Sequence, residues 1–168
     1  MKRVHIVGRK NSGKTTLIVD LVQHLTARGC RVGTIKHTHH HHELDTPGKD
    51  SHRHREAGAA VVGILSPDMS AVFRPRQADA SDTASRYANM APLFAGCDVV
   101  LVEGNLQTTS PKIEVWRVAT ETSPLAGEDS SIAAVITDDT INVQAPVWKR
   151  SEIATVATHL LTMLDWQP

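Results

Sequence analysis

A phosphate-binding loop near the start of the chain is the strongest chemical signal in the sequence. Residues 8–15 read Gly-Arg-Lys-Asn-Ser-Gly-Lys-Thr and fit the pattern G-x-x-x-x-G-K-[ST]. In such a loop the backbone N–H groups surround the phosphates, and Lys14 would place a point charge against the β- and γ-phosphates. The hydroxyl of Thr15 is an expected ligand of Mg²⁺. The pattern therefore predicts a nucleotide site formed by Gly8, Arg9, Lys10, Asn11, Ser12, Gly13, Lys14, Thr15 and Thr16.

The segments on both sides of this loop are the ones that its geometry requires. Residues 4–7 are mostly β-branched and predict a buried strand, and residues 16–27 carry aliphatic side chains at helical spacing. This order directs the loop amides and the N-terminus of the helix toward an anion. A second strand is predicted at residues 31–36, and a strand–helix–strand unit of this kind is parallel and right-handed.

An acidic residue at the end of a buried strand is the expected partner of the loop. Residues 98–104 read Asp-Val-Val-Leu-Val-Glu-Gly, and the apolar run predicts a strand buried on both faces. The two acids that bracket it lie roughly 16 Å apart along the strand. Ligands bind at the carboxyl ends of strands in open α/β sheets. Glu103 is therefore interpreted as the acid that faces the metal or the attacking water, and Asp98 as structural.

A histidine-rich segment follows the second strand. Seven of the ten histidines lie between positions 37 and 54, and four are consecutive at 39–42. Three interpretations remain open from residue chemistry: a metal site, since imidazole suits Zn²⁺ or Ni²⁺; a polar loop that closes over nucleotide and Mg²⁺ with Asp45 directed at the metal; or a solvated loop without a role. The position after a strand favours the second.

The middle of the chain predicts a β-hairpin and a helix. Strands at residues 60–65 and 69–73 are joined by a Ser-Pro-Asp turn. Such a hairpin could extend the edge of the sheet and offer a dimer surface. Asp82 is a possible N-cap of a helix that continues to about residue 94. No linker divides the chain, so residues 1–168 are expected to form one domain.

The C-terminal part predicts two strands and a last helix. Residues 112–118 alternate between polar and apolar side chains, which is typical of a half-exposed strand, and residues 132–137 read as a buried strand. A last helix at residues 151–165 would be capped by Ser151.

A base-reading carboxylate is predicted after the second of these strands. The guanine-reading pattern N-K-x-D is absent, but Asp138 and Asp139 follow residue 137 directly. Either carboxylate could accept two hydrogen bonds from guanine N1–H and the 2-amino group, which adenine cannot offer. The alternative for both residues is a helix cap or a turn.

The charge distribution also favours an anionic ligand near the loop. The net charge is zero, so no strong attraction to nucleic acid or to a membrane is expected. Residues 1–58 hold eleven of the eighteen Lys and Arg residues, against five Asp and Glu. The first strand begins almost at once, and no apolar run is long enough to span a bilayer, so we expect a cytoplasmic protein.

Several motifs together resemble the molybdopterin-guanine dinucleotide biosynthesis protein B (MobB) family. Besides the loop they are Lys36-His37-x-His39-His40, Asp45-x-Pro47-Gly48-Lys49-Asp50-Ser51, Ala57-Gly58-Ala59, Glu103-Gly104 and Pro111-Lys112-Ile113. The resemblance runs from residue 4 to about residue 118. It implies an α/β P-loop NTPase fold of three layers with a mainly parallel sheet extended by the hairpin. It also implies that GTP and Mg²⁺ bind, the metal at Thr15, Asp45 and Glu103, and that GTP is hydrolysed slowly, with Lys14, Glu103 and Asp45 as the catalytic residues.

The resemblance further implies an accessory role in molybdenum cofactor maturation. The partners would be the molybdopterin guanylyltransferase (protein A of the same pathway), which attaches GMP to molybdopterin, the molybdopterin cofactor itself, and a second copy of the chain. Lys36 and His37 would contact phosphates or the pterin pyrophosphate. The family commonly has an aromatic residue and then a lysine after Glu103-Gly104, where this chain has Asn105-Leu106-Gln107. Arg9 or Lys10 could replace that lysine.

Two other functions stay open from the sequence. A P-loop small-molecule kinase would need an acceptor pocket and an arginine-bearing lid. A histidine-rich metallochaperone GTPase would use the histidines to deliver nickel or another metal.

Overall fold

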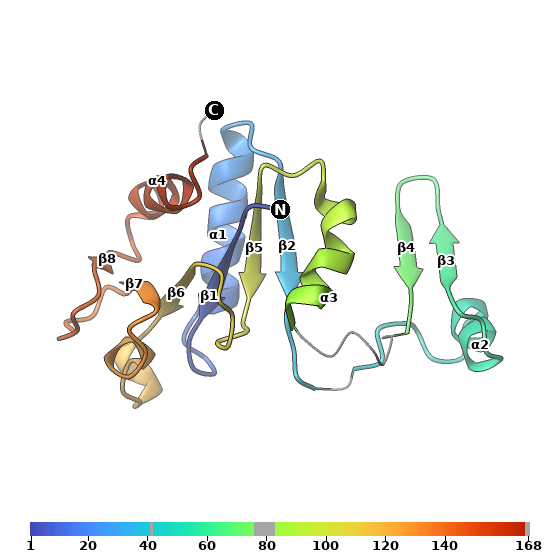
Figure 1. Cartoon of the computed structure of the whole chain (residues 1–168), viewed down its shortest axis with the longest axis horizontal. Helices are drawn as coiled ribbons and strands as arrows, with labels where there is room; N and C mark the ends of the chain where they lie inside the picture. The colour runs from blue at the N-terminus through green and yellow to red at the C-terminus, as the bar shows by residue number, and fades with distance from the viewer. Residues whose placement is uncertain (41, 76–82, 167–168) are drawn as a thin grey trace. The chain divides into compact units, whose positions relative to one another are not determined.

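The chain divides into two compact units. A computed structural model describes residues 1–40, 42–75 and 83–166 (Figure 1). The first unit comprises Met1–Thr38 and Ala88–Pro168, and the second comprises His39–Tyr87. Each unit is described by itself.

A parallel sheet forms the centre of the first unit. Within the described residues it has six strands in the order β2-β5-β1-β6-β7-β8, and every pair is parallel. The strands are β1 (Arg3–Val7), β2 (Val32–Lys36), β5 (Val99–Glu103), β6 (Lys112–Val115), β7 (Ile132–Ile136) and β8 (Val147–Trp148). The predicted parallel α/β sheet is thus confirmed. Because β1 lies between β5 and β6, the ends of both neighbours flank the loop that follows it.

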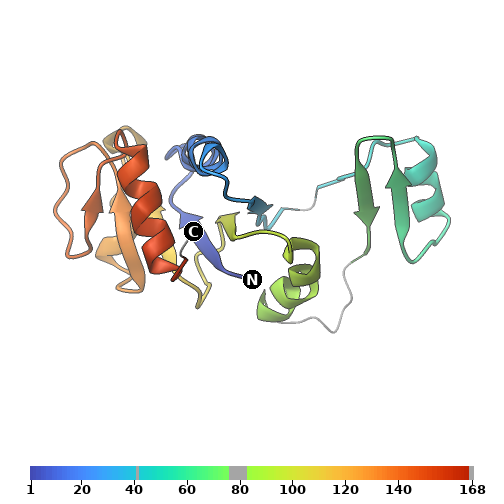
Figure 2. The same cartoon turned by 90° about the horizontal axis from the view of Figure 1, so that it is seen from above.

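One face of this sheet is covered by helices and has an aliphatic core. The helices are α1 (Lys14–Ala27) and α4 (Ile153–Met163), which lie side by side (Figures 1 and 2). Buried leucine, isoleucine and valine side chains from β1, β5, β6, β7 and both helices form one cluster. Each fully buried side chain of this size stabilises the fold by about 1.5–3 kcal/mol. This core holds α1, and hence the phosphate-binding loop, against β1.

The opposite face of the sheet is covered mainly by irregular segments. The helix predicted up to residue 94 is observed as α3 (Thr83–Met90) and the 3₁₀ turn η1 (Ala91–Phe94). A Cβ atom on Gly33 would lie 2.6 Å from the Phe94 ring, so η1 packs directly on β2. Residues 104–111 and 121–131, which include η3 (Leu125–Gly127), also pack against this face. Asp82, the possible N-cap of α3, lies outside the described residues.

The prediction of a half-exposed strand over residues 112–118 is wrong. The strand ends at Val115, and all four of its residues are buried. Lys112 donates a hydrogen bond to a loop carbonyl at 2.7 Å and pairs with Asp129 at 2.7 Å. The Glu114 carboxylate accepts two N–H groups of η3 at 2.8 and 2.9 Å, and desolvation raises its pKa against these hydrogen bonds. The polar side chains of β6 are buried because the covering loops supply their partners.

The start of the last helix also differs from the prediction. α4 begins at Ile153, and no side chain caps its N-terminus. The N–H and hydroxyl groups of Ser151 instead donate to the carboxylate of Asp138 at 3.0 and 2.9 Å. Ser151 therefore ties the segment before α4 to the end of β7. Within the described part of the chain, no helix has the length and apolar character needed to cross a membrane.

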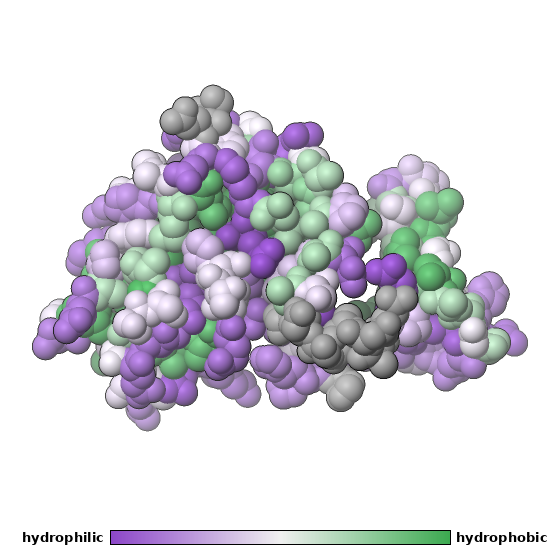
Figure 3. Space-filling view, in the orientation of Figure 1, coloured by the Kyte–Doolittle hydropathy of each residue, from purple (hydrophilic) through white to green (hydrophobic). Residues whose placement is uncertain are grey.

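The second unit contains α2 (Asp50–Glu56) and an antiparallel hairpin of β3 (Val62–Leu65) and β4 (Ser70–Phe73). The hairpin is confirmed, but its strands form a two-stranded sheet of their own. The prediction that it extends the main sheet is therefore wrong within one chain. The hairpin is unusually apolar on its surface (Figure 3). Its exposed large apolar side chains are Val61, Ile64, Leu65, Met69 and Val72.

Candidate nucleotide-binding site

The phosphate-binding loop joins β1 to α1 in a conformation that needs glycine at two points. Gly8 has a φ of +143°, and a Cβ atom there would lie 2.4 Å from the carbonyl oxygen of Val115 on β6. Gly13, the N-cap of α1, has a φ of +97°. Side chains other than hydrogen are strained or excluded in both places. The loop is thus held tightly against β6 with the N-terminus of α1 at its end, an arrangement that suits an anion.

Thr15 and Glu103 meet beside the loop. The Thr15 hydroxyl lies 3.1 Å from each oxygen of the Glu103 carboxylate. Glu103 is the last residue of β5, whereas Asp98, before the other end of that strand, accepts the N–H of Arg31 at 2.7 Å. Asp98 is thus engaged structurally, as interpreted from the sequence. A hydroxyl and a carboxylate are oxygen donors of the kind that Mg²⁺ prefers, so Thr15 and Glu103 fit a magnesium site.

Lys14 points back into the loop. Its ammonium group donates hydrogen bonds to the carbonyl oxygens of Gly8 and Arg9 at 3.0 and 2.7 Å. Desolvation lowers the pKa of Lys14, and the negative charge of Glu103 opposes this effect. The ammonium group is therefore held inside the loop, where a phosphate bound by the loop amides would lie. A phosphate oxygen would be a stronger partner than a neutral carbonyl, because both groups would then be charged.

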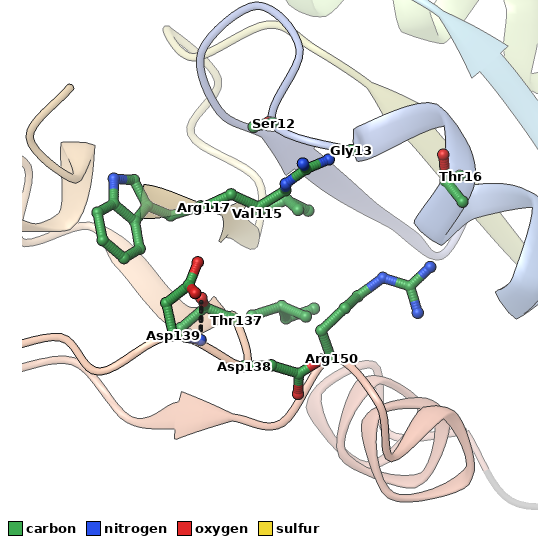
Figure 4. Close-up of a pocket in the computed structure, with 11 residues that line it drawn as sticks. Ser12, Gly13, Thr16, Val115, Arg117, Thr137, Asp138, Asp139 and Arg150 are labelled. Atoms are coloured by element: carbon green, nitrogen blue, oxygen red, sulfur yellow. Dashed lines mark hydrogen bonds between the residues drawn. The ribbon is translucent and has the colours of Figure 1, made fainter. Parts of the chain in front are cut away.

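Two adjoining pockets flank the N-terminus of α1. The first, of about 440 Å³, is lined by the loop, Thr15 and Glu103. The second, of about 380 Å³, lies between the carboxyl ends of β6 and β7 (Figure 4). Gly13, Thr16 and Arg117 line both pockets. Both volumes are of the size that small-molecule ligands occupy.

Asp138 and Asp139 lie on the wall of the second pocket, where the sequence predicted a base reader. One oxygen of Asp138 accepts the two hydrogen bonds from Ser151, which lower the pKa of Asp138. One oxygen of Asp139 accepts the N–H of Val118 at 2.8 Å. Both aspartates thus support neighbouring loops as well as lining the pocket, and base reading stays a prediction for both.

Two arginines of the second pocket were not predicted from the sequence. Arg150 forms an ion pair with Asp20 on α1. Arg117 follows β6 and Trp116 directly. The sequence prediction placed Arg117 inside a half-exposed strand. Arg117 could have been found from its position: it is a basic residue just beyond the carboxyl end of a strand that neighbours β1. The ligand crevice of a parallel sheet lies at that edge.

Lys36 and His37 lie at the end of β2, beside Glu103. Lys36 is the register partner of Glu103 on β5. The N–H of His37 donates to the carbonyl oxygen of Glu103 at 2.9 Å, and a Cβ atom on Gly104 would lie 3.0 Å from the carbonyl oxygen of His37. The structure thus brings these residues next to the acid, with β5 between β2 and the loop-bearing strand.

Asp45, the third predicted metal ligand, belongs to the second unit and is buried. One carboxylate oxygen accepts the N–H of Thr46 at 2.8 Å and the hydroxyl of Ser51 at 3.0 Å. Its other oxygen has no hydrogen-bond partner among the described residues. Asp45 therefore organises the segment that leads into α2, and metal binding by it stays a prediction.

The histidine segment shows no metal site in its described part, from which His41 is missing. Across residues 1–40, 42–75 and 83–166, no group of three or more His, Cys, Asp or Glu side chains is arranged to hold a metal ion. The rings of His40 and His42 pack edge to face, with centroids 6.0 Å apart. This arrangement gives no support to the metallochaperone interpretation.

Comparison with known proteins assigns the family. The family described as "Molybdopterin guanine dinucleotide synthesis protein B" (MobB) matches residues 3–138. Molybdopterin-guanine dinucleotide biosynthesis adapter proteins of Haemophilus influenzae and Escherichia coli are 34% and 32% identical to it, over 92% and 93% of this chain and 85% and 89% of their own lengths. A crystal structure of molybdopterin-guanine biosynthesis protein B superposes with a TM-score of 0.72 at 26% identity, over 97% of this chain and 99% of the other. The chain is a member of the MobB family.

Proposed function

We propose that this protein binds GTP with Mg²⁺ and acts as an adapter in the synthesis of molybdopterin-guanine dinucleotide. The pathway follows from the names of its relatives. The assignment of GTP with Mg²⁺ as the ligand is supported by one observation above all: the Thr15 hydroxyl contacts both Glu103 oxygens beside the loop. A threonine of this motif and an acid at the end of the neighbouring strand are the groups that hold Mg²⁺ in P-loop NTPases.

The two pockets divide the nucleotide between them in this proposal. The loop amides, Lys14 and the N-terminus of α1 hold the β- and γ-phosphates in the first pocket. The second pocket takes the ribose and the guanine base, beside Asp138 and Asp139. Thr15 and Glu103 hold Mg²⁺, which supplies positive charge to the phosphates when it is bound. Hydrolysis is proposed to be slow, and Lys14 and Glu103 are the residues assigned to it.

The base preference tests the ligand assignment. With Mg²⁺ present, GTP is expected to bind at least about 10-fold more tightly than ATP, because only guanine offers two donors to one carboxylate. Isothermal titration of both nucleotides measures the ratio. Asp138→Asn and Asp139→Asn show which aspartate contacts the guanine base. In the variant that lacks this contact, the ratio of GTP affinity to ATP affinity should fall close to one. A preference of the unchanged protein for ATP would contradict the proposal.

The metal assignment predicts a specific loss in Glu103→Gln. The neutral amide is a poorer ligand for a hard cation, so the gain in GTP affinity on adding Mg²⁺ should fall by about 10-fold or more. Titrating GTP with Mg²⁺ and with EDTA measures this gain. Asp98→Asn is the matched control, because it removes a carboxylate beside the opposite end of β5 and should leave the gain unchanged. An equal loss in both variants would argue against a metal site at Glu103.

The proposed partners are the molybdopterin guanylyltransferase, molybdopterin and a second copy of the chain, in the cytoplasm. The dimer is supported by the hairpin, which is paired on one edge of each strand and exposes large apolar side chains. Unpaired strand edges and apolar patches are the features through which such elements associate. Lys36 and His37, beside Glu103, and the basic pair Arg9-Lys10 are the proposed contacts for the phosphorylated partner.

A further inference from the structure

We propose that Arg117 binds the α-phosphate of the nucleotide, as the basic residue at the junction of the two pockets. The inference rests on the proposed function and deepens it. Among the described residues, Arg117 is the basic side chain that lines both pockets. Figure 4 shows it reaching toward Gly13 from the end of β6, while Asp138, Asp139 and Arg150 line the facing wall.

The order of groups along a nucleotide indicates which phosphate lies beside Arg117. The base and ribose occupy one pocket and the terminal phosphates the other, so the chain of atoms between them must pass the residues that both pockets share. Those residues are Gly13, Thr16 and Arg117. The first group after the ribose is the α-phosphate. The Cδ atom of Arg117 lies 3.8 Å from the position that a Cβ on Gly13 would take, so its stem passes the N-terminus of α1, where that phosphate would lie.

The backbone around Arg117 is fixed, whereas its guanidinium group is uncommitted. The indole N–H of the buried Trp116 donates to the carbonyl oxygen of Thr122 at 2.8 Å. The carbonyl oxygen of Arg117 accepts the N–H and hydroxyl of Thr120 at 3.0 and 2.7 Å. The guanidinium group itself has no hydrogen bond or ion pair within residues 1–40, 42–75 and 83–166. An anchored backbone with an unpaired planar fork of donors is suited to binding a phosphate.

The other basic residues of the two pockets are committed or lie further away. The Lys14 ammonium, which is bonded to two carbonyls of the loop, is assigned to the β- and γ-phosphates in the proposed function. Arg150 is held by Asp20 on α1. Lys10 lines the first pocket alone, away from the ribose and base. Arg117 is therefore the cation available where the α-phosphate would pass between the pockets.

The test compares guanosine nucleotides of different length. Arg117→Gln should lower the affinities for GMP, GDP and GTP by the same factor, about 10- to 100-fold, because all three nucleotides carry the α-phosphate. Affinities come from competition with a fluorescent GDP derivative in the presence of Mg²⁺. Arg117→Lys keeps the charge without the planar fork and should lose less. Arg28→Gln, which removes the same charge at the C-cap of α1, should bind like the unchanged protein.

Each outcome separates this inference from the proposed function. The unfolding midpoint of nucleotide-free Arg117→Gln should equal that of the unchanged protein, because the guanidinium group makes no hydrogen bond or ion pair with the described residues. A loss confined to GTP would place Arg117 at the γ-phosphate and overturn the assignment, as would a loss for GDP and GTP that spares GMP. Unchanged affinities in Arg117→Gln, together with lost binding in Lys14→Ala, would overturn the inference and leave the proposed function standing. Failure of the unchanged protein to bind any guanosine nucleotide would overturn the proposed function itself.

Discussion

Replacing Lys14 with alanine is expected to lower GTP affinity by at least about 100-fold, equivalent to about 2.7 kcal/mol. The ammonium group is held inside the loop by the carbonyls of Gly8 and Arg9. It therefore needs little reorganisation to meet the β- and γ-phosphates, and little side-chain entropy is lost on binding. Its partial burial strengthens a charge–charge contact relative to one in open solvent. The variant loses this contact and leaves phosphate charge in the loop uncompensated.

Lys10→Ala is the matched comparison for this prediction. It removes the same charge from the same loop, but the Lys10 side chain is exposed and, among the described residues, makes no hydrogen bond to the loop carbonyls. Isothermal titration with GTP and Mg²⁺ should give a loss in Lys10→Ala far smaller than that in Lys14→Ala. Similar losses would indicate general attraction between a basic surface and an anion. A GTP affinity unchanged by Lys14→Ala would remove the phosphate-binding assignment altogether. The unfolding midpoint without nucleotide checks that both variants are folded.

The loop and the position of Lys14 could be predicted because the pattern that specifies them is local in sequence. Residues 8–16 are consecutive, and the glycines and the lysine are fixed by the conformation of one loop. Glu103 is distant along the chain, yet its place follows from one rule. A parallel strand beside β1 must end at the same edge as the loop, so its last residue lies beside the loop. The structure contains both features as the sequence predicted them.

The burial of polar side chains on the face of the sheet opposite α1 and α4 could not be predicted, because their partners lie far away in sequence. Alternating polar residues in a strand normally face solvent. In β6 they face loops instead, and their partners are a backbone carbonyl, Asp129 and the first N–H groups of η3. Nothing in residues 112–118 specifies those partners. For the same reason the predicted strand included Arg117, whereas the observed strand ends two residues before it, at Val115.

The hairpin and Ser151 show a related limit. The turn chemistry of Ser66-Pro67-Asp68 predicted the hairpin correctly, but pairing of its outer edges depends on elements that the local sequence does not specify. Ser151 has the chemistry of a helix cap, and a competing acceptor at the end of β7, Asp138, takes both of its donors. Local propensity identifies which groups need partners, and the tertiary fold decides which partners they find.

The stability of the first unit is expected to fall as the pH drops below about 6.5, with His5 as the main cause. His5 is fully buried on β1, two residues before the loop. Its Nδ1 lies 3.1 Å from the carbonyl oxygen of Gly104, and the hydroxyl of Thr108 lies 3.3 Å from its Nε2. The neutral ring satisfies both contacts if Nδ1–H donates and Nε2 accepts. His5 thus fastens the segment that follows Glu103 to the strand that precedes the phosphate-binding loop.

Burial lowers the pKa of His5 from 6.5 to about 4. The positive charges of Arg3, His37 and Lys112 act in the same direction, and the hydrogen bond to Gly104 opposes them. Because the folded-state pKa lies below the unfolded one, the stability is fully present above pH 6.5 and is lost as the pH falls toward 4. The linkage amounts to about 2 kcal/mol by pH 5 and about 3 kcal/mol by pH 4.

His5→Asn isolates this contribution. Asparagine keeps a donor near the position of Nδ1 and loses the acceptor at Nε2, so the variant should be less stable at pH 7.5 by about 1–3 kcal/mol. Between pH 7.5 and 5 it should lose about 2 kcal/mol less than the unchanged protein does. Urea unfolding followed by tryptophan fluorescence reports on the correct unit, because Trp116, Trp148 and Trp166 all belong to it.

Other groups with shifted pKa values do not mimic the effect of His5 between pH 7.5 and 5. Asp129 and Glu43, with pKa values of about 2, contribute stability that is lost below their ordinary pKa values, under pH 5. The raised pKa of Glu114 acts with the opposite sign, because its protonated form is favoured in the fold. His54→Asn, which removes an exposed imidazole from α2, should keep the pH dependence of the unchanged protein. Equal slopes in His5→Asn and the unchanged protein would mean that the buried ring is not the group whose protonation destabilises this sheet.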